Sequence, residues 1–346
     1  MRVRYRPLQA LALATLAALV TACAAFAPLY DRAMRQALTD ITVERADPAQ
    51  SGLLLIATRA GGSGFGFQNR ERPERPEDVA AIVPPSVREA YRAPVPGYAA
   101  DANPMPGSPS DPYGEIVWRD GVCDHVRLVA GACAEQAGEL MVSEADAENF
   151  DLGVGTTLAI PGIPRNDASA SLPAARLVVV GVYAQQPSAY WLGLQLTGRS
   201  GLVEPGPVVK VQHDVWLTAR STFQGHGMPP LPGGRSTVAY QLDAAALDVD
   251  ELFDLSADIH RLAKTAAAGG DGTIVTPYSG LPDLADDVRE QIDQSRVTVP
   301  LLVAQLGLLS LVVLWLTLAA VTEQRRPEVA LARLRGRGRR GARALL

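Results

Sequence analysis

The chain has 346 residues, of which 47% are hydrophobic, and a formal net charge of −5. The charge is unevenly spread: residues 31–296 hold 21 basic and 35 acidic side chains, whereas both ends are basic. A net acidic central region argues against nucleic-acid binding there, and arginines beside an apolar segment are explained more simply by membrane topology.

Two uncharged segments lie near the ends of the chain. Residues 7–30 and 297–322 carry no charge, and each exceeds the roughly 20 apolar residues that a membrane-spanning helix needs. Arginines flank the outer side of both segments, and short basic flanks stay in the cytoplasm. We therefore predict two transmembrane helices in the cell membrane, cytoplasmic segments at 1–6 and 323–346, and an extracytoplasmic domain over 31–296.

The first apolar segment allows an alternative. The sequence Val20-Thr21-Ala22-Cys23 resembles a lipobox, which would make residues 1–22 a cleaved signal and Cys23 a lipid anchor. The apolar run continues past Cys23, where a lipoprotein turns polar, so we favour an uncleaved helix.

Beyond the first span, Tyr30, Met34 and Leu38 recur at the spacing of one helical face, which predicts a stalk helix. Residues 52–58 form an apolar run typical of a buried strand. Residues 61–114 are rich in glycine, proline and charge and are expected to be flexible.

Within that flexible region one short helix is expected over residues 76–92. Pro84-Pro85 would break this helix, because proline lacks the N–H that the helical ladder needs.

A β-rich core is expected over residues 115–242, where alternating and β-branched runs are separated by glycine and proline turns. Ser143 is placed to cap a short helix over 144–150, with Asp146 near the capping-box position. The expected strands are residues 115–118, 126–129, 139–143, 156–160, 176–182, 208–211, 214–218 and 236–242.

Helices return over residues 250–296. Residues 250–268 place apolar side chains on one helical face, and Pro282 opens a second helix with Leu284, Val288 and Ile292 at helical spacing. This second helix runs towards residue 297, so both spans are expected to carry helical extensions outside the membrane, the second stalk lying near 284–295.

Two cysteines, Cys123 and Cys133, lie ten positions apart in the predicted extracytoplasmic domain. In an oxidising compartment such a pair is typical of a disulfide. Zinc would need two further ligands, and only His125 is near; the disulfide is therefore preferred.

No residue pattern indicates an enzyme, a cofactor site or a metal site. The four histidines, His125, His213, His226 and His260, match no ligand spacing and are interpreted as isolated surface residues. The acidic pairs Asp286-Asp287 and Asp146/Glu148 lie on expected helices and are interpreted as solvated faces.

The C-terminal tail forms a short basic amphipathic segment, in which Val329, Leu331 and Leu334 alternate with arginines. One interpretation is a juxtamembrane helix that binds anionic lipid. The other is a docking helix for a cytoplasmic partner.

Three segments carry a family resemblance. RRPEVALARLRG at 325–336 resembles the signature that follows the second helix of a permease half in FtsX-like, MacB-like ABC transporter permeases. GELMVSEADAENFDLGVGTTLAI at 138–160 and LVVVGVYA at 177–184 are similar to the periplasmic core pattern of that family. Cys123 and Cys133 fall where actinobacterial members carry paired cysteines.

The resemblance implies an α+β membrane protein, in which two transmembrane helices with helical stalks flank a β-rich MacB-like core. It implies three partners: a cytoplasmic ABC ATPase, further permease spans or a second permease half, and the lipid bilayer. The chain ends at Leu346, inside the coupling region, and so is expected to be the N-terminal part of such a permease or a truncated paralogue. The residues implied in ATPase coupling are Arg325, Arg326, Glu328, Val329, Leu331, Arg333 and Leu334.

The function implied is to couple the ATPase to the extracytoplasmic domain for export, for lipoprotein or lipid handling, or for mechanotransmission. A different class remains open: a two-span extracytoplasmic sensor or a binding protein that regulates a peptidoglycan hydrolase. Such a sensor would be expected to carry a longer cytoplasmic module.

Overall fold

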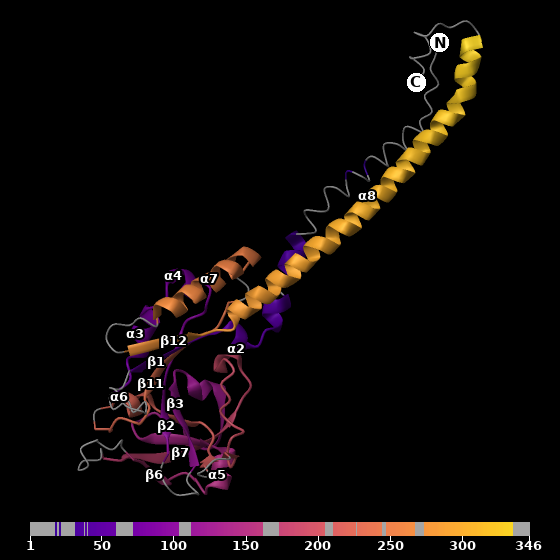
Figure 1. The fold of residues 1–346 in the computed structure, drawn as a ribbon. Coiled ribbons are helices and arrows are strands. Elements are labelled where there is room, and N and C mark those ends of the chain that lie inside the picture. The colour runs from indigo at the N-terminus through magenta and orange to yellow at the C-terminus, as the bar shows by residue number, and fades with distance from the viewer. Residues whose placement is uncertain are drawn as a thin grey trace. The chain divides into compact units, whose positions relative to one another are not determined.

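The structure is a computed structural model, drawn in Figure 1. It divides into two compact units, residues 1–38 with 288–346 and residues 39–287, and each is described by itself. The residues described are 18, 21, 32–37, 39, 41–59, 72–103, 112–161, 173–204, 210–225, 227–243, 247–266 and 273–334.

The larger unit is built on one mixed β-sheet. Within the described residues the strands follow the order β12-β1-β11-β2-β3-β10-β5-β7-β4, with β6, β8 and β9 attached beside this path. Their bounds are β1 Leu53–Arg59, β2 Val95–Ala102, β3 Pro112–Arg119, β4 Val126–Gly131, β5 Glu139–Ser143, β6 Thr157–Ile160, β7 Ala175–Gln185, β8 Val203–Glu204, β9 Lys210–Gln212, β10 Trp216–Thr218, β11 Arg235–Tyr240 and β12 Thr273–Tyr278.

Short helices and two long ones accompany the sheet. Helix α7 packs against β12 and α4, and α3 packs against β11; Figure 1 shows these helices beside the β12-β1-β11 part of the sheet. The bounds are α2 Pro48–Ser51, α3 Pro76–Ala81, α4 Pro85–Glu89, α5 Glu144–Asn149, α6 Arg220–Gln224, α7 Val249–Ala266, α8 Leu281–Leu334, and the 3-10 helices η1 Val122–His125 and η2 Ala189–Trp191.

The centre of the sheet is buried on both faces. Trp118 of β3 belongs to one apolar cluster with Tyr98 and Trp216, whereas its neighbour Val117 belongs to a second cluster with Tyr183 and others. Because successive strand residues point to opposite faces, burial of both sets shows that each face is covered.

The structure agrees with most strands expected from the sequence and differs over residues 76–103. That part of the supposedly flexible region contains α3, α4 and β2, with the helix broken at Pro84 as expected and Pro85 opening α4. Strand β2 forms although it is rich in proline, glycine and alanine, because β11 and β3 pair with it on both sides. Tertiary pairing here overrides weak local propensity.

The sheet also extends beyond the expected core of 115–242. Strand β1 confirms the buried run after residue 52, with Leu53, Leu55 and Ala57 buried. Strand β12 was not expected; it pairs with β1 in antiparallel register.

Two predicted helices are confirmed with small shifts of their ends. Helix α7 buries Leu252, Leu255, Ile259 and Leu262, the face expected from the sequence. Helix α8 begins one residue before Pro282, runs for 54 residues and buries Leu284 among its first residues.

Residues 32–37, 39 and 41–45 are helical, which agrees with the first stalk; Tyr30 and Leu38 lie outside the described residues. The first apolar segment lies outside them too, except for residues 18 and 21. In the described part of the chain, no helix combines the length and the apolarity that a bilayer crossing requires. The spans at 7–30 and 297–322 stay predictions.

Candidate functional site

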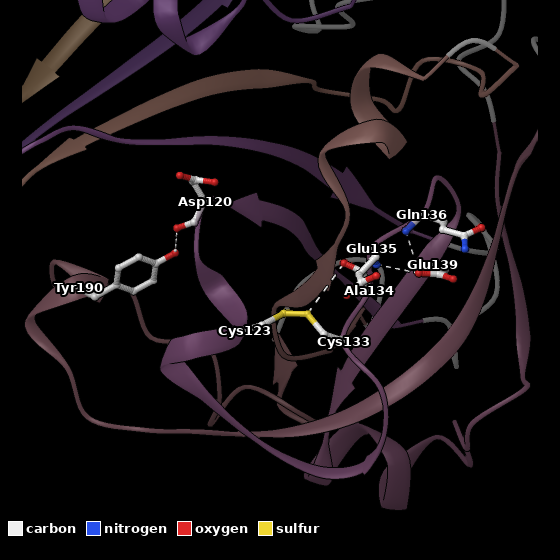
Figure 2. Close-up of a disulfide and its surroundings, with 8 residues drawn as sticks. All are labelled: Asp120, Cys123, Cys133, Ala134, Glu135, Gln136, Glu139 and Tyr190. Atoms are coloured by element: carbon white, nitrogen blue, oxygen red, sulfur yellow. Dashed lines mark hydrogen bonds between the residues drawn. A yellow bond between two sulfur atoms is a disulfide. The ribbon is translucent and has the colours of Figure 1, made fainter.

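The first candidate site is the disulfide region. Cys123, in η1, and Cys133, which follows β4, are joined by a disulfide with their Cα atoms 6.2 Å apart, as the sequence predicted (Figure 2). The bond closes η1 and β4 into one loop. It lies beside the turn at Asp120, whose carbonyl accepts a 2.7 Å hydrogen bond from the Tyr190 hydroxyl.

An aromatic stack links this loop to the 3-10 helix η2. The His125 and Tyr190 rings are stacked with centroids 3.8 Å apart, and Trp191 meets Tyr190 edge-on. The Arg119 guanidinium carbon lies 4.6 Å from the centroid of the Tyr190 ring, a cation–π geometry. His125, expected to be an isolated surface residue, is therefore packed between the disulfide loop and η2.

Arg119 was missed from the sequence, which placed it in a turn with Asp120 and Gly121. It is the last residue of β3 and is only 6% exposed. Its Nη1 donates a 3.3 Å hydrogen bond to the Trp191 carbonyl. Burial lowers the pKa of Arg119 from its ordinary value, yet arginine stays protonated across the physiological range.

A second candidate site is a buried polar centre that joins α5 to β10. The Asp214 carboxylate accepts hydrogen bonds from the backbone N–H groups of Arg199 at 2.7 Å and Ser200 at 3.0 Å, and from the Ser143 hydroxyl at 2.6 Å. Ser143 also caps α5, since its oxygen accepts the Asp146 N–H at 3.0 Å. One serine therefore serves both the helix and the carboxylate.

Asp146 completes this centre from the first turn of α5. Its carboxylate accepts the Asp214 N–H at 3.1 Å and the Trp216 indole N–H at 2.9 Å. Burial raises the pKa of Asp146, while hydrogen bonds and the nearby His213 oppose that shift. The prediction that Asp146 lies on a solvated face is wrong, because the helix start at Ser143 turns it towards β10; Asp286 and Asp287 are exposed as expected.

His213 is buried as well, so its interpretation as a surface histidine is wrong. Its ring stacks on Trp216 with centroids 3.9 Å apart, Nδ1 contacts the Asp214 carbonyl, and Nε2 lies 3.1 Å from the Ala102 carbonyl. Burial lowers the pKa of His213, against the opposing effect of these carbonyls and carboxylates. Gly114 leaves room for the ring, because a Cβ there would meet it at 2.6 Å.

The chemistry of this centre is structural. Both carboxylates accept two or more hydrogen bonds and are fully buried, so neither is placed to attack or to transfer a proton to a ligand in solvent. The stretch 138–160, which the sequence analysis singled out, therefore builds the domain interior. Among the described residues, no three side chains of ligand type come together to hold a metal ion; His226 lies outside those residues.

The predicted coupling residues occupy the last turns of α8. Arg325, Arg326, Glu328, Val329, Leu331, Arg333 and Leu334 all have helical backbone, as an amphipathic docking segment requires. Residues 335 and 336 lie outside the described residues. Whether this segment contacts an ATPase stays a prediction.

Comparison with known proteins finds two distant structural likenesses. The periplasmic region of MacB from Actinobacillus actinomycetemcomitans matches with 12% identity and a TM-score of 0.31, over 69% of this chain and 92% of that one. A domain of a putative permease protein from Porphyromonas gingivalis matches with 14% identity and a TM-score of 0.29, over 67% and 90%. No protein-family model and no curated protein matches the chain.

Proposed function

We propose that the chain is the N-terminal part of an FtsX-like, MacB-like ABC permease, which couples a cytoplasmic ATPase to an extracytoplasmic domain. The observation that carries the proposal is helix α8. One unbroken helix runs from Leu281, a buried residue of the domain, to Leu334 in the arginine-rich segment.

The lengths along α8 suit this role. At about 1.5 Å per residue, residues 281–296 rise about 24 Å as a stalk and residues 297–322 rise about 39 Å. The second distance exceeds the hydrocarbon core of about 30 Å. Along it, large apolar side chains are exposed, as lipid contact would require: Leu301, Leu308, Leu309, Leu311, Val312, Val313, Trp315 and Leu316.

The coupling segment follows directly. Lipid attraction needs positive charge but gains nothing from Glu328 or from a defined apolar stripe, whereas a protein groove uses both. We therefore assign residues 325–334 to ATPase docking. Because the segment is continuous with the stalk, a displacement at the ATPase would reach the domain through one helix.

The test is co-purification of the ATPase encoded beside this gene with a version of the chain extended by the following permease spans. Glu328→Lys is expected to weaken ATPase recovery while strengthening binding to anionic vesicles. Leu331→Asp is expected to abolish recovery, because a charge replaces an apolar anchor.

The matched control is Glu323→Lys, which makes the same charge change five residues earlier in the same helix. It should strengthen vesicle binding equally and leave ATPase recovery unchanged. If Glu328→Lys and Leu331→Asp recover the ATPase as well as the unmodified chain does, docking is refuted and the segment is a lipid-binding helix.

A further inference from the structure

The Arg119 guanidinium has one hydrogen-bonded edge and one without partners. Nη1 donates to the Trp191 carbonyl, whereas Nε and Nη2 are buried and have no hydrogen-bond partner among the described residues. In a planar guanidinium, the Nε and Nη2 hydrogens point the same way along one edge and form a fork. That fork matches two oxygens of a carboxylate or a phosphate.

The positive charge of Arg119 is also uncompensated. Within the described residues no carboxylate pairs with it, while Arg220, whose guanidinium carbon lies 5.2 Å from the Trp118 ring centroid, pairs with Glu77 at 2.6 Å. Arg235, also shielded from solvent, pairs with two acids. A buried cation without an anion is costly, so Arg119 departs from the arrangement of these arginines.

The fork is held in place by its surroundings. Tyr190 covers the guanidinium and is fixed by its hydroxyl bond to the Asp120 carbonyl and by its stack on His125. Trp191, which receives the other edge, is anchored by its indole N–H to the Gln186 carbonyl at 2.9 Å. A donor pair fixed in this way loses little conformational entropy when it binds.

The fork also lies close to solvent. Asp120 and Gly121, which follow Arg119, are exposed, and Tyr190 and His125 are half-buried. A single aromatic layer therefore separates the guanidinium from the surface, and movement of Tyr190 would open it.

We propose that Arg119 is the binding group for an oxyanion, a carboxylate or phosphate group carried by an extracytoplasmic ligand. Nε and Nη2 donate to two oxygens of that group, and the Tyr190 ring covers the face of the guanidinium. The site is separate from the coupling segment, and its test involves no ATPase.

The test uses the full chain in detergent, exchanged into chloride buffer and titrated with sodium acetate or inorganic phosphate at constant ionic strength. Two signals are followed: the ¹⁵N–¹H resonance of Arg119 Nε and the unfolding temperature. We expect both to shift saturably, because a ligand that binds only the folded state stabilises it. A response confined to acetate identifies a carboxylate ligand, and one that favours phosphate identifies a phosphate ligand.

Three variants test the fork itself. Arg119→Lys keeps a charge but loses the fork and should bind roughly tenfold more weakly or worse. Arg119→Met should lose the response and, in chloride, should be no less stable than the unmodified protein, because an unpaired buried charge has been removed. The matched control Arg220→Met removes a ring-stacked arginine that already has an acidic partner, and should keep the full response.

The proposal is overturned if the Arg119 Nε resonance of the unmodified protein does not move with either anion. It is overturned equally if Arg119→Lys responds like the unmodified protein, since the response is then that of an adventitious ion only. The resonance of the unmodified protein decides the matter even if Arg119→Met does not fold.

Discussion

Replacing Ser143 by alanine removes two contacts at once from the domain interior. The α5 cap is lost, which costs about 0.5–2 kcal/mol. The hydroxyl that donates to the buried Asp214 carboxylate at 2.6 Å is also lost, and a hydrogen bond to a charged group contributes about 1.5–3 kcal/mol. Together these give a loss of about 2–5 kcal/mol in the free energy of unfolding, or roughly 4–20 °C in the unfolding temperature of a domain of this size.

The assay is thermal and denaturant unfolding of the full chain in detergent, followed by tryptophan fluorescence, to which the buried Trp216 contributes. The control is Ser188→Ala, since Ser188 caps η2 at an exposed position with a 3.2 Å bond to the Tyr190 N–H and touches no buried carboxylate. Its loss should cost about 1 kcal/mol or less. If Ser143→Ala is no more destabilising than Ser188→Ala, the Asp214 network does not stabilise the domain as argued.

Three further outcomes are expected. Cys123→Ser, like reduction of the Cys123–Cys133 bond, should lower stability by about 2–3 kcal/mol, since the bond closes a short loop; unchanged denaturation midpoints with and without reductant would contradict this. His213→Gln should flatten the loss of stability as pH falls below the usual histidine value of 6.5, because the pKa of His213 is depressed in the fold and the unfolded chain takes up the proton first; equal pH slopes would refute it. Gly97→Ala should cost about 1–3 kcal/mol, because a Cβ there would meet Thr237 Oγ1 at 2.5 Å and the Trp118 carbonyl at 3.0 Å; a chemical-denaturation midpoint equal to that of the unmodified chain would be the contrary result.

The elements that the sequence predicted well carry their signal locally. Strand β5 has the predicted ends, and Ser143 caps α5 as expected, since an apolar run followed by serine and acidic residues specifies both. Helix α7 begins and ends within two residues of its prediction. Strands β2 and β12 were missed because β2 contains proline and glycine, β12 contains a proline, and each is a strand by virtue of its neighbours.

The buried polar residues could not be found in the same way. Asp146 and Asp214 are 68 positions apart, and Arg119 is buried with Trp191, which lies 72 positions later. Charged side chains are most often exposed, and only the tertiary partner reverses that expectation. The predicted coupling residues depend on a partner outside this chain, so neither periodicity nor the fold decides their role.

The pairing of β1 with β12 sets how the domain would bear a pulling force. The chain enters β1 at Leu53, shortly after the first helical segment, and leaves β12 at Tyr278, three residues before α8. Leu54 is opposite Tyr278, and the ladder runs from there to Arg59 opposite Thr273. Both connections therefore attach at the same end of the ladder. Pulling them apart would load one hydrogen bond at a time, as in a zipper, instead of shearing all of them together. Moving both connections in the same direction would leave the ladder unloaded, so this geometry makes the domain sensitive to the separation of its two connections and insensitive to their common displacement.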